Sequence, residues 1–317
     1  MNHPLVQAFN PLGKQFLRRV VLPASLNPFA STLSISAILA FGEFAHIKTV
    51  PAFEMLYEDF LDGLYEDKHT IVVDSSGNTA HAVARLASAF GFSNVVVVMS
   101  ADVPAAKRNI FAALSTPTII SVPKGESVAE VARELGEKPG HYHLNQYAHR
   151  GNINAHEMYT GPEIVRLMGR DLGVIAIALG SGGTAAGVGQ YMHEVCPHAQ
   201  VLGVRPRLGQ QVPGARDRKK MAEVVRLSWE KVVPTVVEVS RKEAFEATRR
   251  LWNAVEQPGP TSGLAYVGLL QYLRHLESTP LTLELLAGTD VAFFCPDSAM
   301  LYSDVIIAEL DSDQGID

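Results

Sequence analysis

The sequence has little cysteine, no strong excess of charge of one sign and no long apolar run. Its two cysteines, Cys196 and Cys295, are too few for a disulfide scaffold and favour buried thiols in a reducing compartment, so we expect a cytoplasmic protein. A net charge of −6 without a strongly basic stripe argues against a nucleic-acid partner. We find no cleavable signal, and no stretch of the about 20 apolar residues that span a membrane. We therefore expect a soluble, cytoplasmic globular protein.

Alternating strand and helix patterns cover most of the 317 residues, of which 47% are apolar. We expect strands at Arg19–Leu22, Thr70–Val73, Val95–Met99, Thr118–Val122, His141–Gln146, Val174–Ala178, Gln200–Val204, Thr235–Val239 and Asp290–Phe294. We expect helices at Leu33–Phe44 with Ser31 as N-cap, and at Ala52–Asp62, Ala80–Phe90, Ala105–Leu114, Ser127–Leu135, Tyr159–Gly169, Ala185–Val195, Arg241–Val255 and Gly263–His275. The charged stretch Gly209–Lys231 is interpreted as a surface excursion. Strands separated by helices predict parallel pairing with right-handed crossovers, and therefore a doubly wound α/β fold.

The sequence is organised around a glycine-rich loop, Gly180–Thr184, which lies between a buried strand and a helical run. This order leaves unpaired N–H groups at the positive end of a helix dipole, and such a helix end binds anions. The glycines let the backbone approach a phosphate, while Ser181 and Thr184 add hydroxyl donors. The same loop fits a dinucleotide site, Gly180-x-Gly182-x-x-Ala185, with Arg205 placed to meet a 2′-phosphate.

Three further polar loops follow or end expected strands: Ser75–Thr79, Asn145–His149 and Cys295–Ser298. Loops at the carboxyl ends of parallel strands gather on one edge of the sheet, so the four loops together predict a ligand cleft. Within them, His149 is a weaker candidate for ligand contact. The pair His141-x-His143 is more typical of alternation along a strand than of a metal site, because no third ligand is evident, and we expect no metal.

Six segments, in order along nearly the whole chain, carry the motifs of one known family. Ser75-Ser76-Gly77-Asn78-Thr79 corresponds to TSGNT, and Gly180-Ser181-Gly182-Gly183-Thr184 with Gly187-Val188-Gly189 corresponds to GTGGT…GVG. His156–Ile164 is close to HYxTTGPEI, and Gln146-Tyr147-Ala148 stands where QFxNP is found. Thr261-Ser262-Gly263 matches SSGA, and Pro296 with Tyr302 matches PSxGERY. The chain thus resembles fold-type II pyridoxal-phosphate enzymes, with cysteine synthase the nearest branch and tryptophan synthase β-subunit a relative. This resemblance displaces the dinucleotide interpretation, which explains only one loop.

The resemblance implies two doubly wound parallel-sheet α/β domains of the tryptophan synthase β-like kind, with a cleft between them. Residues 43–152 are expected to form the smaller domain with the SSGNT loop, and residues 1–42 with 153–317 the larger domain with the phosphate-binding loop. A homodimer is also expected. The resemblance implies pyridoxal phosphate as cofactor, with Asn78 at its 3′-oxygen and Asp297 or Ser298 at its pyridine nitrogen. Its phosphate would lie on Gly180, Ser181, Gly182, Gly183 and Thr184, and the substrate on Ser75, Ser76, Gly77, Thr79 and Gln146.

One motif departs from the family. Its Schiff-base lysine lies in NPxxSxKDR, which we match to Asn27–Ile35, so that Leu33 stands at the lysine position. A leucine can neither hold the cofactor covalently nor move a proton. We therefore expect no catalytic residue, non-covalent binding of pyridoxal phosphate or its amino-acid adduct, and lost or altered chemistry on an amino acid. Two alternatives stay open: a non-catalytic pseudoenzyme that acts as a binding or regulatory partner, and a pocket repurposed for another phosphorylated small molecule.

Overall fold

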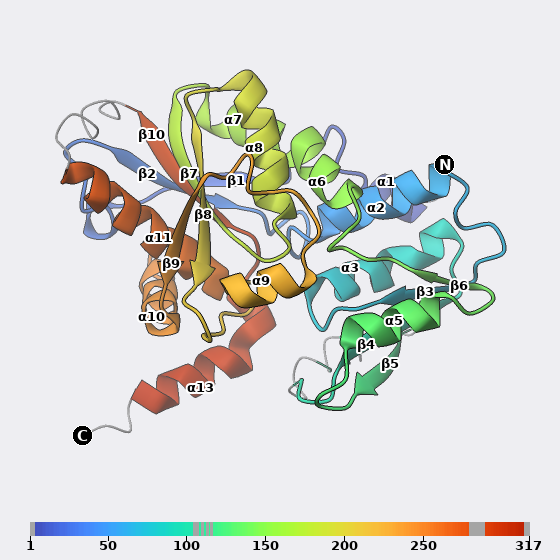
Figure 1. Ribbon diagram of the computed structural model, residues 1–317. Helices are drawn as coiled ribbons and strands as arrows, with labels where there is room; N and C mark the ends of the chain where they lie inside the picture. Colours follow the sequence, from blue (N-terminus) through green and yellow to red (C-terminus); the bar gives the residue numbers. More distant parts are fainter. Residues whose placement is uncertain are drawn as a thin grey trace. The chain divides into compact units, whose positions relative to one another are not determined.

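The computed structural model describes residues 4–103, 108, 111, 114, 117–278 and 289–313 (Figure 1). The chain forms two compact units, and each is described by itself: a smaller unit of residues 1–14 and 48–155, and a larger unit of residues 15–47 and 156–317. We expected residues 1–14 in the larger domain. Instead, α1 (Pro4–Phe9) packs against α2 (Thr49–Leu61) and α3 (Asn78–Leu86) of the smaller unit. No helix within the described ranges is both long enough and apolar enough to cross a membrane.

The smaller unit is built on a four-stranded parallel sheet in the order β5 (Pro117–Val122), β4 (Asn94–Ser100), β3 (Thr70–Val73) and β6 (His141–His143). Strand β3 is buried on both of its faces, because alternate side chains enter different cores. Ile71 and Val73 pack with α2 and α3, whereas Val72 packs with α5 (Val128–Gly136). Burial on both faces explains why β3 reads as a continuous apolar run. The remaining helical elements are η2 (Ala87–Phe90) and α6 (Gly151–Ala155). The expected helix Ala105–Leu114 falls largely on residues outside the described ranges.

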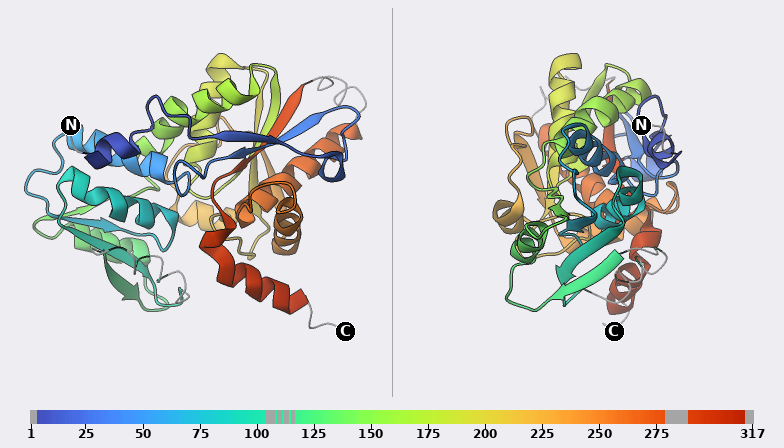
Figure 2. Two further views of the ribbon diagram at one scale, coloured as in Figure 1. Left: turned by 180° about the vertical axis from the view of Figure 1, so that it is seen from behind. Right: turned by 90° about the vertical axis from the view of Figure 1, so that its right-hand side faces the viewer.

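The larger unit contains a six-stranded sheet with helices on both faces (Figure 2). Its strand order is β1 (Arg18–Val21), β2 (Ser34–Leu39), β10 (Asp290–Cys295), β7 (Leu172–Ala178), β8 (Gln200–Pro206) and β9 (Thr235–Val239). Every neighbouring pair is parallel except β1 with β2. The helical elements are η1 (Ala24–Leu26), the π-helical η3 (His156–Thr160), α7 (Gly161–Met168), α8 (Gly183–Val195), α9 (Arg218–Val224), α10 (Arg241–Leu251), α11 (Pro260–Glu277), η4 (Ala299–Tyr302) and α13 (Ser303–Asp313).

The expected helix over Leu33–Phe44 is wrong. Residues Ser34–Leu39 form strand β2, which lies between β1 and β10. Their apolar side chains alternate in the manner of a strand, since Ile35, Ala37 and Leu39 all enter the core that α11 covers. A period of two residues therefore describes this segment, whereas the expected helix was based on the motif that precedes it.

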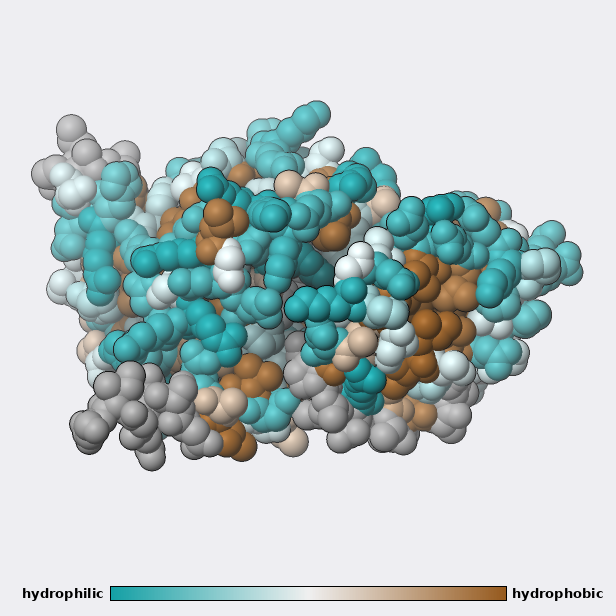
Figure 3. Space-filling view, turned by 60° about the horizontal axis from the view of Figure 1, so that its bottom comes forward, coloured by the Kyte–Doolittle hydropathy of each residue, from teal (hydrophilic) through white to brown (hydrophobic). Residues whose placement is uncertain are grey.

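The stretch Gly209–Lys231 is more than a surface excursion. The basic residues Arg218, Lys219 and Lys220 begin helix α9, which the Asp217 side chain caps by accepting from the Lys220 N–H. However, Val212, Met221 and Trp229 are buried. The surface drawn in Figure 3 is mostly hydrophilic and is broken by hydrophobic patches, the most compact of them on the smaller unit.

Replacing Leu33 by lysine should destabilise the protein. Leu33 is 3% exposed in the core of the larger unit, so the change buries a charge without a partner. We expect the free energy of unfolding to fall by about 3–5 kcal/mol, measured by urea denaturation. Leu208, which is 50% exposed, supplies the matched control, and Leu208→Lys should change stability by no more than about 0.5 kcal/mol. Equal stability of the two variants would contradict the placement of Leu33.

Candidate functional site

The glycine-rich loop lies where β7 ends and α8 begins. Gly182 is the N-cap of α8 and has a φ of +82°, in the left-handed region that favours glycine. The Ser181 Oγ accepts from the Gly183 N–H at 3.4 Å. The 13 residues of α8 direct their first N–H groups and the positive end of the helix dipole toward this loop. This geometry suits an anion, whose binding stays a prediction.

The His156–Ile164 segment supports the loop from its own unit. His156 is fully buried in η3, and its Nε2 lies 3.1 Å from the Thr184 Oγ1. The other ring nitrogen, Nδ1, lies 2.9 Å from the Thr160 Oγ1. The imidazole thus connects two threonine hydroxyls, one of which belongs to the glycine-rich loop. The motif that carried the resemblance at residues 156–164 therefore has a structural role in this fold.

Two residues that the sequence did not single out also pack on the loop. A Cβ on Gly180 would lie 2.5 Å from the Gly214 carbonyl oxygen, and a Cβ on Gly182 would lie 2.9 Å from the Trp229 Cδ1. Both contacts come from the 209–231 stretch, so this stretch covers the loop closely enough to exclude side chains there. A tryptophan within a charged segment was the one signal in the sequence that pointed to this role.

Asp297 is a buried carboxylate that follows the carboxyl end of β10. The Tyr302 hydroxyl donates to its Oδ2 at 2.6 Å, and a Cβ on Gly259 would lie 2.3 Å from its Oδ1. Since β10 and β7 are neighbouring parallel strands, Asp297 and the glycine-rich loop follow adjacent strand ends on one edge of the sheet. Ser298 has another role, because its Oγ accepts from the Met300 N–H and caps η4. Of the two residues expected at the pyridine nitrogen, Asp297 is the more deeply buried.

An unsatisfied hydroxyl lies close to both of these groups. Thr261, near the start of α11, is 2% exposed, and its Oγ1 forms no hydrogen bond within the described part of the chain. A Cβ on Gly214 would lie 3.0 Å from the Thr261 Cγ2 and 3.7 Å from the Tyr302 hydroxyl, while the Gly214 carbonyl approaches Gly180. Buried hydroxyls are normally hydrogen-bonded. An orphaned hydroxyl between an anion loop and a carboxylate fits a ligand with several polar groups, as pyridoxal phosphate is.

Leu33 lies on the opposite edge of the sheet from this loop. Ser34 pairs with Asp290 at the amino end of β10, and Asp290 pairs with Leu172 at the amino end of β7. Gly180 follows the carboxyl end of β7, whose seven residues span about 20 Å. Leu33 therefore does not belong to the site.

The Asn27-Pro28 pair, which fixed our alignment of the lysine motif, is a structural turn. The Asn27 Nδ2 donates to the Leu33 carbonyl at 2.8 Å, and its Oδ1 accepts from the Phe29 N–H at 3.0 Å. The side chain thus closes the turn that leads into β2. The structure therefore corrects our match of this segment to the lysine motif: residues 27–33 form a turn at the amino end of β2.

Lys48 is the only lysine between β2 and α2, and it stands directly at a helix start. It is the N-cap residue of α2 and is partly buried. The preceding residue, Ile47, donates its N–H to the Pro296 carbonyl at 2.8 Å, next to Asp297 in the chain. From the sequence we expected the order strand, loop, lysine position and helix around Leu33; the structure has this order around Lys48. From the sequence alone we set Lys48 aside, because it lies well outside the turn that begins at Asn27-Pro28.

The smaller unit brings the SSGNT loop and Gln146 together. The loop Ser75–Thr79 joins β3 to α3, with Gly77 as N-cap and Asn78 as the first helical residue. The Thr79 hydroxyl donates to the Gln146 Oε1 at 2.7 Å. Both are buried, so this hydrogen bond fixes the amide of Gln146 against the amino end of α3.

The histidines of β6 have other partners than a metal. The His143 Nε2 lies 3.3 Å from the Asp74 Oδ1, and the His141 Nδ1 lies 2.9 Å from the Pro139 carbonyl. Among the residues that the structure describes, no group of His, Cys, Asp or Glu side chains is arranged to hold a metal ion.

Comparison with known proteins identifies the family. Residues 45–287 match the family described as pyridoxal-phosphate dependent enzyme. The chain belongs to this family. Cysteine synthase B of Pseudomonas aeruginosa is 31% identical over 242 residues, which cover 74% of this chain and 79% of that protein. A probable cysteine synthase of Bacillus subtilis is 26% identical over 272 residues, 81% of this chain and 86% of that protein. The chain is therefore cysteine-synthase-like, and pyridoxal phosphate is the family's cofactor.

Solved structures agree on the fold. An O-acetylserine dependent cystathionine beta-synthase from Helicobacter pylori superimposes with a TM-score of 0.75 and 25% identity, over 94% of this chain and 96% of that chain. An O-ureido-L-serine synthase superimposes with a TM-score of 0.77 over 98% of this chain and 95% of that chain, and its 21% identity speaks for the fold alone. The two α/β units are thus those of a fold-type II pyridoxal-phosphate enzyme, as the resemblance implied. The family match includes Lys48 and excludes Leu33.

Gly180→Ala should weaken the binding of pyridoxal phosphate by about tenfold or more. The added Cβ meets the backbone oxygen of Gly214, which cannot rotate away, so the loop must move and lose N–H hydrogen bonds to the phosphate. Titration calorimetry measures the dissociation constant. Gly169→Ala is the control: its positive φ strains an alanine, but the added Cβ meets no atom within 4 Å, so any loss of stability leaves the glycine-rich loop in place. Equal affinity of both variants would refute the loop as the phosphate site.

Proposed function

We propose that this protein is a pyridoxal-phosphate enzyme of the cysteine synthase kind, in which Lys48 is the lysine that holds the cofactor. The observation that carries the proposal is the position of Lys48 as the N-cap of α2, the helix that follows β2, inside the segment that matches the family. Bound pyridoxal phosphate supplies the electron sink that lets a proton leave the substrate Cα. The amine of Lys48 would take up that proton and return it.

The other site residues divide into cofactor and substrate groups. Gly180–Thr184 would hold the phosphate by backbone N–H groups and by the Ser181 and Thr184 hydroxyls. Asp297, kept in place by Tyr302, would accept a hydrogen bond from the protonated pyridine nitrogen, and Asn78 would reach the 3′-oxygen. Ser75, Ser76, Gly77, Thr79 and Gln146 would bind the carboxylate of the substrate.

The names of the relatives support an O-substituted serine as the substrate class. The curated relatives are cysteine synthases, and the 25%-identical structure is described as O-acetylserine dependent. We propose that the chain replaces the O-acyl group of such a serine by a nucleophile. The two buried free cysteines and the family resemblance support a cytoplasmic homodimer.

Borohydride reduction with pyridoxal phosphate should fix the cofactor on Lys48, detected by peptide mass spectrometry. Lys48→Ala should abolish this labelling and lower the rate of β-replacement on O-acetyl-L-serine with sulfide by about 10²–10⁴-fold, because it removes the acid–base group. Lys138→Ala, an exposed change in the same unit, should leave both unaltered.

Three other outcomes of this test correspond to the functions that we expected when Leu33 was placed at the lysine position. Pyridoxal phosphate that binds without labelling any lysine would favour non-covalent binding with lost or altered chemistry. Binding without turnover in wild type would favour a pseudoenzyme that acts as a binding or regulatory partner. A site that takes another phosphorylated small molecule but not pyridoxal phosphate would favour a repurposed pocket. Each of these results would overturn the proposal.

A further inference from the structure

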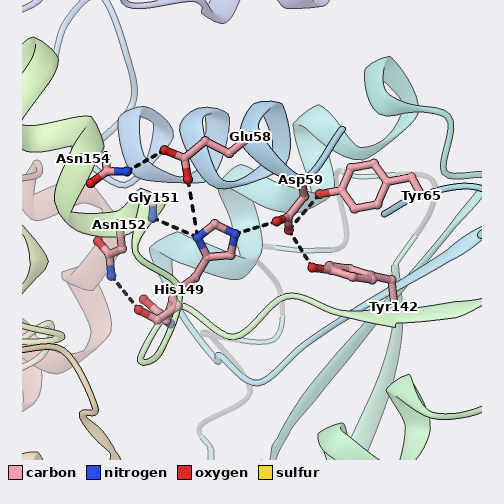
Figure 4. A network of polar contacts seen from close by, with 9 residues as sticks. Glu58, Asp59, Tyr65, Tyr142, His149, Gly151, Asn152 and Asn154 are labelled. Atoms are coloured by element: carbon pink, nitrogen blue, oxygen red, sulfur yellow. Dashed lines mark hydrogen bonds and ion pairs between the residues drawn. The ribbon is translucent and has the colours of Figure 1, made fainter. Parts of the chain in front are cut away.

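The smaller unit contains a polar network centred on one buried carboxylate (Figure 4). Asp59 lies near the end of α2 and is 5% exposed. Its Oδ2 accepts from the Tyr142 hydroxyl at 2.7 Å and from the Tyr65 hydroxyl at 3.4 Å. Its Oδ1 lies 2.8 Å from the His149 Nε2. Asp59 thus joins α2, β6 and the loop that carries Gln146.

The two tyrosines act as permanent donors to Asp59. Burial, together with the negative charge of Asp59, raises the pKa of Tyr65 and of Tyr142 far above the ordinary tyrosine value. Both hydroxyls therefore keep their protons at neutral pH. With two donors fixed on its Oδ2, Asp59 presents its Oδ1 to His149.

The geometry around His149 requires a neutral imidazole. The Gly151 N–H donates to its Nδ1 at 2.9 Å, so Nδ1 carries the lone pair and Nε2 carries the proton that goes to Asp59. The Glu58 Oε2 is 4.0 Å from Nδ1, beyond hydrogen-bonding distance, while its Oε1 accepts from the Asn154 Nδ2 at 2.7 Å. A Cβ on Gly151 would lie 2.7 Å from the Glu58 Oε2 and 3.0 Å from the His149 ring, so a larger residue there would have to displace one of these side chains.

The loop that His149 anchors also fixes Gln146. The His149 carbonyl accepts from the Asn152 N–H at 3.1 Å, and the Asn152 side chain donates to the Gln146 carbonyl at 2.7 Å. The Gln146 side chain in turn accepts from Thr79 of the SSGNT loop. An unbroken series of hydrogen bonds therefore runs from Asp59 through His149 and Asn152 to Gln146.

We propose that His149 is a positioning residue for Gln146: its imidazole, clamped between Asp59 and the Gly151 amide, holds the 145–152 loop against α2. The role of Gln146 toward the substrate rests on the proposed function. The hold of His149 on the loop does not, since all of its contacts lie within the smaller unit.

Two substitutions separate the two hydrogen bonds of the ring. His149→Gln keeps a donor that reaches Asp59 but removes the acceptor for the Gly151 N–H. His149→Asn keeps an acceptor beside Gly151 but is too short to reach Asp59, and asparagine is the residue that the QFxNP motif carries at this place. If either variant unfolds, thermal denaturation reveals it and the other variant still tests the proposal.

The first measurement is amide hydrogen exchange of residues 145–152 in the full chain without cofactor. In His149→Gln we expect exchange to become about two- to tenfold faster, since one backbone hydrogen bond is lost. His149→Asn should keep the protection at Gly151, because its side-chain oxygen replaces Nδ1 as the acceptor. Exchange at residues 145–152 that is the same in wild type and His149→Gln would overturn the proposal.

The second measurement separates positioning from general stability. In protein loaded with pyridoxal phosphate, the dissociation constant of L-serine should rise about two- to tenfold in His149→Gln, while that of pyridoxal phosphate stays unchanged. A merely structural loss would weaken both ligands together, and that result would overturn the positioning role. If Lys48 failed to hold the cofactor while the exchange results came out as expected, the proposed function alone would fall.

Discussion

The direction of the strands decides which residues of the larger unit can meet. β2, β10, β7 and β8 run parallel, so every loop that follows one of them lies on the same edge. The glycine-rich loop and Asp297 share that edge, and the chain leaves β2 on it in the direction of Lys48. Leu33 enters β2 from the other edge. Because Ser34–Leu39 is a strand and not a helix, Leu33 and the residues that follow β2 lie on opposite edges of the sheet.

Local patterns in the sequence were sufficient for most of the fold. The buried strands over Thr70–Val73 and Val174–Ala178 were read correctly because apolar, β-branched runs bounded by turn residues have few other solutions. The glycine-rich loop could also be predicted from the sequence. A positive φ at Gly182 and the close approach of another backbone segment at Gly180 both favour glycine. Family motifs added the relation between segments that no local pattern supplies.

The errors and omissions have a common physical origin, which is that contacts distant in sequence leave no local signal. Asn27-Pro28 forms a turn whether a helix or a strand follows it. Only the pairing of Ser34–Leu39 with β10 shows that a strand follows. Trp229 and Gly214 pack on the loop from more than 30 residues away. Asp59 and His149 are 90 residues apart, and the sequence around one residue gives no sign that it contacts the other.

The imidazole of His156 makes the two threonines beside it interdependent. A neutral ring has one donor and one acceptor nitrogen. It can therefore accept a hydrogen bond from only one of the hydroxyls of Thr160 and Thr184, and it must donate a hydrogen bond to the other. For the Thr184 hydroxyl to point its proton at an anion on the loop, Nε2 must carry the ring proton and Thr160 must donate to Nδ1. An anion at the start of α8 would thus select a single tautomer of a fully buried histidine, and the orientation of a hydroxyl in the π-helical turn would report on whether the loop is filled.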